Sequence, residues 1–131
     1  SSLTNPDEHS YQLVIKAWSK CVRKLDPCDS DEIEHASRMC RQFLQEAVDN
    51  LLADRIMYNQ VLAASRYNAK EAEHIFQKMK VEEIADYSSY VFLLRAYEQC
   101  SQPNLFEHAE KAEKIILQMG IEAGDDRMKL P

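Results

Sequence analysis

The chain has 131 residues and a hydrophobic content of 45%, which is enough for one compact domain or one short array of repeats. Its two glycines and four prolines are few, and because both residue types interrupt helices, the composition favours a mostly helical fold. The net charge of −6 argues, as a total, against a nucleic-acid ligand, and no apolar run reaches the roughly 20 residues of a membrane span, so we expect no membrane partner.

Three segments of the chain share a pattern that is centred on a tyrosine. Each tyrosine follows an aspartate by four residues, precedes two aliphatic residues at the third and fourth positions, and precedes an alanine by six. This spacing forms the apolar stripe of an amphipathic helix. We therefore predict first helices at approximately 8–22, 56–67 and 87–99. The equivalent residues are Asp7, Tyr11 and Ala17, then Asp54, Tyr58 and Ala64, and finally Asp86, Tyr90 and Ala96.

A second helix follows each first helix, and on it an alanine and a bulky apolar residue recur seven residues apart. The pairs are Ala36 with Phe43, Ala72 with Met79, and Ala112 with Met119. Seven residues are two helical turns, so both members of a pair lie on one face. Ser30–Asp31 are expected to cap the second helix of the first pair, and Gly120 is expected to end that of the third pair in a left-handed conformation.

These helix pairs predict three helix–turn–helix repeats at approximately 7–53, 54–85 and 86–126, in a single helical-repeat domain over 1–131. One pair cannot bury its apolar face alone, whereas stacked pairs bury a continuous one. The predicted fold is therefore all-α, a right-handed α–α superhelix or solenoid.

The middle unit runs from Asp54 through Tyr58–Asn59, Ala72 and Met79 to a closing Asp86. A unit of this length and pattern resembles the pentatricopeptide repeat (PPR). The third unit is similar, with Val91 where asparagine is commoner, and the first has Gln12 after its tyrosine and a longer loop between its helices. The resemblance covers nearly the whole chain. Tetratricopeptide repeats (TPR) share the helix-pair organisation, but not the aspartate four residues before the tyrosine.

The resemblance to PPR proteins implies binding of single-stranded RNA, with one base read by a few side chains of each repeat. In that family the residue after the tyrosine and the closing aspartate contact the base edge. The matching pairs here are Gln12 with Asp54, Asn59 with Asp86, and Val91 with Asp125 or Asp126. The pair of Asn59 and Asp86 resembles the combination associated with uracil, whereas valine has no hydrogen-bonding side chain.

The same aspartates also have a structural explanation. Asp7, Asp54 and Asp86 stand where an N-cap would satisfy the first backbone N–H groups of a helix. Capping and base recognition therefore remain alternative roles for these three residues.

Basic residues concentrate on the predicted first helices, although the chain as a whole is acidic. Such a distribution suits an anionic ligand on the surface that these helices form. We expect Lys16, Lys20, Arg66 and Arg95 to contact RNA. The competing explanation is that the acidic second helices are simply solvated faces with ion pairs one turn apart.

The alternative function is a TPR-like protein–protein interaction scaffold, because a helical solenoid can also bind peptides or partner helices. We predict no enzymatic activity, no cofactor and no metal site, since no cluster of nucleophile, base or metal ligands occurs. The four cysteines lack compact spacing and indicate reduced thiols in an intracellular protein. The resemblance adds a mitochondrial or plastid location and a role in organellar RNA processing. Because three stacked pairs are about the minimum for a stable array, we also expect further repeats to flank this segment.

Overall fold

The computed structural model describes residues 5–100 and 105–122, and this part of the chain contains six α-helices and no strands. The helices are α1 (Glu8–Lys24), α2 (Ser30–Asp49), α3 (Arg55–Ala64), α4 (Ala69–Val81), α5 (Tyr87–Gln99) and α6 (Leu105–Glu122). The prediction of an all-α fold is confirmed.

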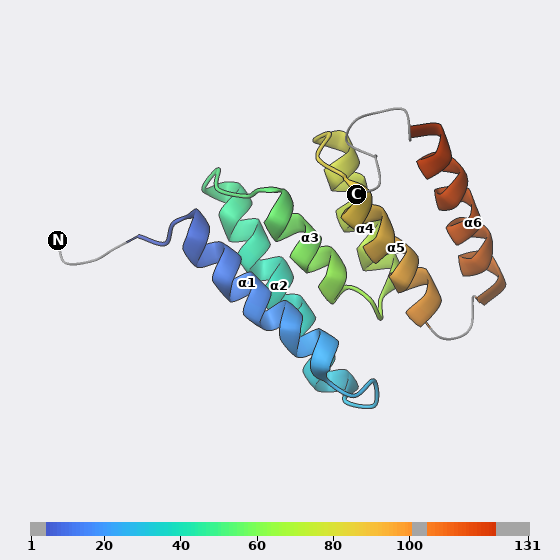
Figure 1. The fold of residues 1–131 in the computed structure, drawn as a ribbon. Helices are drawn as coiled ribbons and strands as arrows, with labels where there is room; N and C mark the ends of the chain where they lie inside the picture. The colour runs from blue at the N-terminus through green and yellow to red at the C-terminus, as the bar shows by residue number, and fades with distance from the viewer. Residues whose placement is uncertain (1–4, 101–104, 123–131) are drawn as a thin grey trace. The chain divides into compact units, whose positions relative to one another are not determined.

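The helices divide into two compact units. Unit 1, Ser1–Ala64, contains α1, α2 and α3, and unit 2, Ser65–Pro131, contains α4, α5 and α6 (Figure 1). The boundary falls inside the predicted second repeat, 54–85, and separates α3 from α4. Each unit is therefore described by itself.

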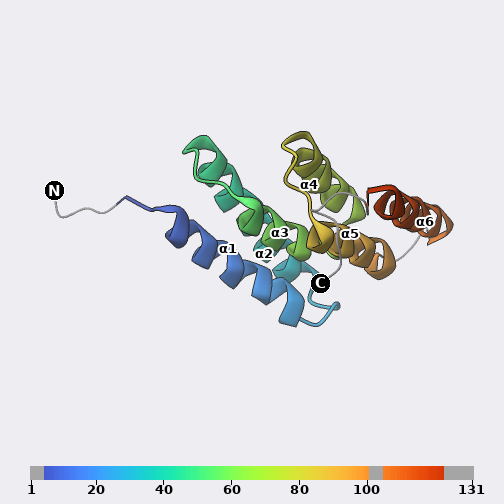
Figure 2. The same cartoon turned by 45° about the horizontal axis from the view of Figure 1, so that its top comes forward.

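In unit 1, α1 packs against both α2 and α3, and α2 also contacts α3 (Figure 2). The predicted stripe of α1 is buried at Tyr11 and Ile15. The thiol of Cys40 on α2 donates to the backbone oxygen of Ile15 at 3.7 Å. Burial raises the pKa of the Cys40 thiol to about 12, which keeps this group protonated as a packing residue.

In unit 2, α5 packs against α4 and α6. The ring of Tyr90 on α5 meets the ring of Phe76 on α4 edge to face, with centroids 4.9 Å apart. The hydroxyl of Tyr97 donates to Glu73 of α4 at 2.6 Å, and the ammonium of Lys111 on α6 lies 3.0 Å from the same carboxylate oxygen. Glu73 therefore connects all three helices of the unit.

Each first helix begins at an aspartate cap. The carboxylates of Asp7, Asp54 and Asp86 each accept a hydrogen bond from the backbone N–H three residues later, at 2.8 to 3.1 Å. At Asp86 the hydroxyl of Ser89 completes a capping box by accepting from the aspartate's own N–H. The capping role that the sequence allowed for these aspartates is confirmed.

The chain enters two of these caps through matching turns. Leu51 follows α2 with φ 60°, and Glu83 follows α4 with φ 58°. In both turns the next residue donates its N–H to the oxygen five residues earlier, as in a Schellman motif: Leu52 to Ala47, and Ile84 to Met79. The two turns are 32 residues apart in the sequence, as are Tyr58 and Tyr90, so the matching sequence pattern is accompanied by matching backbone conformation at these turns.

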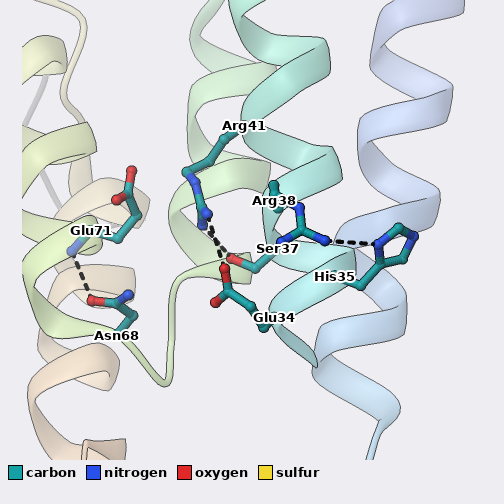
Figure 3. A network of polar contacts seen from close by, with 7 residues as sticks. All are labelled: Glu34, His35, Ser37, Arg38, Arg41, Asn68 and Glu71. Atoms are coloured by element: carbon teal, nitrogen blue, oxygen red, sulfur yellow. Dashed lines mark hydrogen bonds and ion pairs between the residues drawn. The ribbon is translucent and has the colours of Figure 1, made fainter. Parts of the chain in front are cut away.

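Polar contacts on α2 and at the start of α4 are local. Arg41 donates to the hydroxyl of Ser37 at 2.9 Å and pairs with Glu34 at 3.5 Å (Figure 3). Asn68 caps α4 by accepting from the N–H of Glu71 (Figure 3). Because Asn68 also donates its own N–H to the oxygen of Ser65 in a turn, the preceding helix ends at Ala64, and its predicted extent of 56–67 is wrong at the C-terminal end.

Two predictions about helix ends are also wrong. Helix α2 begins at Ser30 itself, with Asp29 in the N-cap position and no side-chain capping bond, so Ser30–Asp31 belong to the first turn. Helix α6 continues through Gly120 to Glu122, so the glycine does not end it. In both cases the helix includes residues whose types are common at helix ends but do not end the helix here.

Replacing Leu51 with glycine is expected to stabilise the chain by about 1 kcal/mol, because a left-handed conformation costs an L-residue about that much and glycine almost nothing. The Leu51 side chain is 93% exposed, so its loss removes little packing. Urea unfolding at pH 7 measures the change. Leu51→Ala is the control, since alanine keeps the strain; an equal gain in both variants would contradict the explanation.

Replacing Tyr97 with phenylalanine is expected to lower the free energy of unfolding by about 1.5–3 kcal/mol at pH 7, the usual value for a hydrogen bond to a charged group. Burial raises the pKa of Glu73, but the hydrogen bonds from Tyr97 and Lys111 outweigh it and leave this pKa below its ordinary 4.5. The stabilisation is therefore present above pH 4.5 and is lost as the pH falls through the lowered pKa. Urea unfolding at pH 7 and at about pH 3 should show the difference shrinking in acid; a constant difference would refute the assignment.

Candidate nucleic-acid interface

Two predicted base-reading residues meet at the junction of α1 and α3. The side-chain amide of Gln12 on α1 donates to a carboxylate oxygen of Asp54, the residue that precedes α3, at 2.5 Å. The residues are 42 positions apart in the sequence, so packing of α1 against α3 brings them together. Both side chains are half-buried. An amide and a carboxylate side by side offer donors and acceptors of the kind that recognise a base edge.

Asp54 has two roles in this arrangement. One carboxylate oxygen accepts the N–H of Met57 and caps α3, and the other accepts from Gln12. The cap fixes the position of the carboxylate relative to α3, and Gln12 ties it to α1. Capping and base recognition are therefore compatible roles for this residue.

Glu8 is a member of this site that the sequence analysis did not single out. It lies on α1 one turn before Gln12, and its carboxyl is close enough to Asp54 for a hydrogen bond between the two acids. This hydrogen bond and the negative charge of Asp54 raise the pKa of Glu8. The four-residue spacing that places Glu8 and Gln12 on one helix face could have indicated that Glu8 belongs to this site. The contact of Glu8 with Asp54, however, depends on where α3 packs.

Lysines continue the same side of α1. Lys16 and Lys20 follow Gln12 at intervals of four residues, and both are exposed, as are Arg23 and Lys24 in the last turn. None of these four residues has a carboxylate partner within the described parts of the chain. Unpaired cations at one-turn spacing can contact successive phosphates of a nucleic-acid strand.

The other predicted residues occupy varied environments. Asn59 is 9% exposed, so its amide is buried in unit 1. Asp86 and Val91 are half-buried at the start of α5, where the aspartate is the N-cap, and Arg95 on the same helix is exposed, with its guanidinium 5.8 Å from the ring of Phe92. Arg66 is half-buried beside Tyr67, and its Nε has no hydrogen-bond partner. Asp125 and Asp126 lie outside the described residues.

A groove of about 550 Å³ opens between the end of α1 and the start of α2. Its apolar wall includes Trp18, Leu25 and Ala36, and the ring of His35 meets the indole edge to face at 5.4 Å. Trp18 is half-buried. The groove can accept an apolar side chain.

Comparison with known proteins assigns no family: no family model matches the chain, and neither a curated protein nor a solved structure matches it. Among residues 5–100 and 105–122, no group of three or more histidine, cysteine, aspartate or glutamate side chains is placed to hold a metal ion. None of the described helices is long and apolar enough to cross a membrane.

Replacing Glu8 with glutamine is expected to stabilise the chain at pH 7. Because Asp54 raises the pKa of Glu8, folding disfavours the ionised carboxyl, and the wild type loses stability as the pH rises above the ordinary value of 4.5. The variant lacks this loss. The free energies of unfolding of the wild type and the variant should therefore differ at pH 7 but not at about pH 4. Glu110→Gln, at an exposed position of α6, is the matched control and should show no such divergence; the same divergence there would disprove the role of Asp54.

Proposed function

We propose that the chain binds single-stranded RNA along the side of unit 1 formed by α1 and the start of α3. The observation that carries the proposal is the contact between Gln12 and Asp54, next to the unpaired Lys16 and Lys20. The amide and the carboxylate would read the edge of a base, and the lysines would contact the phosphates on either side. The acidic total charge does not oppose this, because the basic residues of α1 form a local surface.

The proposal includes a repeat architecture of the PPR type, with three helix pairs in a right-handed superhelix. Two features support it. The first helices of consecutive pairs, α1 and α3, are in contact within unit 1, as stacking of repeats requires. The turns around Leu51 and Glu83, each leading into an aspartate cap, have matching conformations. The proposed mitochondrial or plastid location rests on the resemblance to PPR proteins alone.

The affinity of this chain for RNA should be low. One base contributes about 1–3 kcal/mol through stacking and edge contacts, and the ordering of a flexible strand consumes part of this. Gln12 and Asp54 form one assembled pair, while Asn59 is buried and Val91 has no polar side chain. Phosphate contacts should therefore dominate, and binding should depend strongly on salt.

A protein-interaction scaffold is the second candidate function. It is favoured by the exposed apolar side chains of α6, among which Phe106 is 80% and Leu117 is 63% exposed. Large apolar side chains that cluster on a surface mark sites of protein contact. This surface is on a different helix from Gln12, Lys16 and Lys20, so substitutions separate the two functions.

Fluorescence anisotropy with a labelled oligouridine and with a labelled mixed-sequence strand tests RNA binding over a range of salt concentrations. We expect the wild type to bind both at low salt. The double substitution Lys16→Gln and Lys20→Gln should weaken binding and reduce the slope of log K against log salt by about 1.4, which corresponds to two lost phosphate contacts on a single strand.

The matched control is Lys70→Gln with Lys78→Gln, which makes the same change of charge at exposed positions of α4. This control should leave affinity and salt slope unchanged. Absence of binding at low salt, or an equal loss in both double variants, would refute the proposed interface. Binding of a protein partner by a wild-type chain that does not bind RNA would favour the scaffold.

A further inference from the structure

The interface between α4 and α5 in unit 2 shows how the second helix of one pair packs on the first helix of the next. A stripe on α4, formed by Ala69, Glu73, Phe76 and Lys80, faces α5. The N–H of Ala69 donates to the Cys100 sulfur at 3.0 Å, and Lys80 donates to the hydroxyl of Tyr90 at 2.8 Å. Glu73 and Phe76 contact Tyr97 and Tyr90, as described above. The members of the stripe recur every three or four residues, so they form one continuous helix face.

The equivalent stripe on α6 is uncovered. The alignment of Ala72 with Ala112 and of Met79 with Met119 places it 40 residues later. Its members are Ala109, Glu113, Ile116 and Gly120, and all four are exposed. Ile116, at the position of the buried Phe76, is 55% exposed, and the adjacent Leu117 is 63% exposed. No described helix packs on this stripe.

The complementary surface on α1 is also partly exposed. The alignment of Tyr90 with Tyr11 places the counterparts of α5 residues 79 positions earlier. On α5, the side chains of Leu93, Ala96, Tyr97 and Cys100 are buried. Their counterparts on α1 are Val14, Ala17, Trp18 and Cys21, of which the first and third are half-buried and the other two are exposed. These residues form an apolar face next to the groove that Trp18 and Cys21 line.

One polar contact of the α4–α5 interface can also form between the α6 stripe and the α1 face. Glu113 occupies the position of Glu73, which accepts from the hydroxyl of Tyr97. Trp18 occupies the position of Tyr97, and its indole N–H can donate a hydrogen bond to the carboxylate of Glu113. A polar pair beside an apolar centre fixes the register of a contact.

We propose that the chain binds a second copy of itself head to tail, with the α6 stripe (Ala109, Glu113, Ile116 and Gly120) of one molecule docked on the α1 face (Val14, Ala17, Trp18 and Cys21) of the other. The contact reproduces the packing of α4 on α5 in unit 2. It is heterologous, because the two molecules contribute different surfaces. Val14, Trp18 and Cys21 lie on the opposite side of α1 from Gln12 and Lys16, so the contact is independent of RNA binding.

Sedimentation velocity of the wild type and two variants tests this proposal. Ala17→Glu places a charge on the α1 face, and Ile116→Glu places one on the α6 stripe. Both positions are exposed. Circular dichroism is used to check that each variant remains helical. We expect the weight-average mass of the wild type to rise with concentration over about 5–500 µM, the range of weak contacts. Gln77→Glu adds the same charge at an exposed position of α4 and should associate like the wild type.

The mixture of the two variants gives the decisive measurement. Each variant alone should have the mass of one chain, because it lacks one of the two required faces. An equimolar mixture should form a species of two chains and no larger one, because one intact α1 face and one intact α6 stripe remain available. A monomeric wild type, dimerisation of either variant by itself, or a mixture that stays monomeric would overturn the proposal.

A disulfide tests the register of the contact. Cys100 contacts the backbone of Ala69 in unit 2, so Cys21 of one copy should lie beside residue 109 of the other. With Cys28→Ser as background, Ala109→Cys should give a covalent dimer when oxidised glutathione accepts the two electrons, and Cys21→Ser should abolish it. Glu110→Cys, at an exposed neighbouring position on another side of α6, should not cross-link; equal cross-linking at 109 and 110 would refute the register.

Discussion

The aspartate cap at the start of each first helix is the constraint on which the other features of this chain depend. A cap satisfies a backbone donor that has no partner inside the helix, and it thereby fixes where the helix begins. Asp54 shows how much follows from this. Its carboxylate starts α3 through Met57 and also receives the amide of Gln12, so the beginning of one helix is held against the side of another. The candidate interface consists of this junction and the lysines beside it.

The turns before the caps determine the direction of the chain as it enters α3 and α5. Leu51 and Glu83 adopt left-handed conformations that cost free energy for residues other than glycine. The Schellman hydrogen bonds that follow compensate by satisfying carbonyl groups at the ends of α2 and α4. Because both turns have the same geometry, the chain enters α3 and α5 in equivalent ways.

Charge and apolar surface are separated around α1. Lys16 and Lys20 are on the side that carries Gln12, while Trp18 and Cys21 border the groove on the side of α2. The two sides of this helix therefore differ in chemistry. The acidic total charge obscures this arrangement, because an average over the chain contains no information about which helix face carries a charge.

Local sequence determined the helices, their aspartate starts and the burial of Tyr11, Tyr58 and Tyr90, because periodicity and capping depend only on residues within a few positions of one another. Tertiary structure decided which equivalent positions are covered. Ala17 is exposed while Ala64 and Ala96 are buried, although the local pattern is the same. The contact of Gln12 with Asp54 and the burial of Asn59 likewise depend on how helices pack, and packing brings together residues whose separation along the chain carries no local signal.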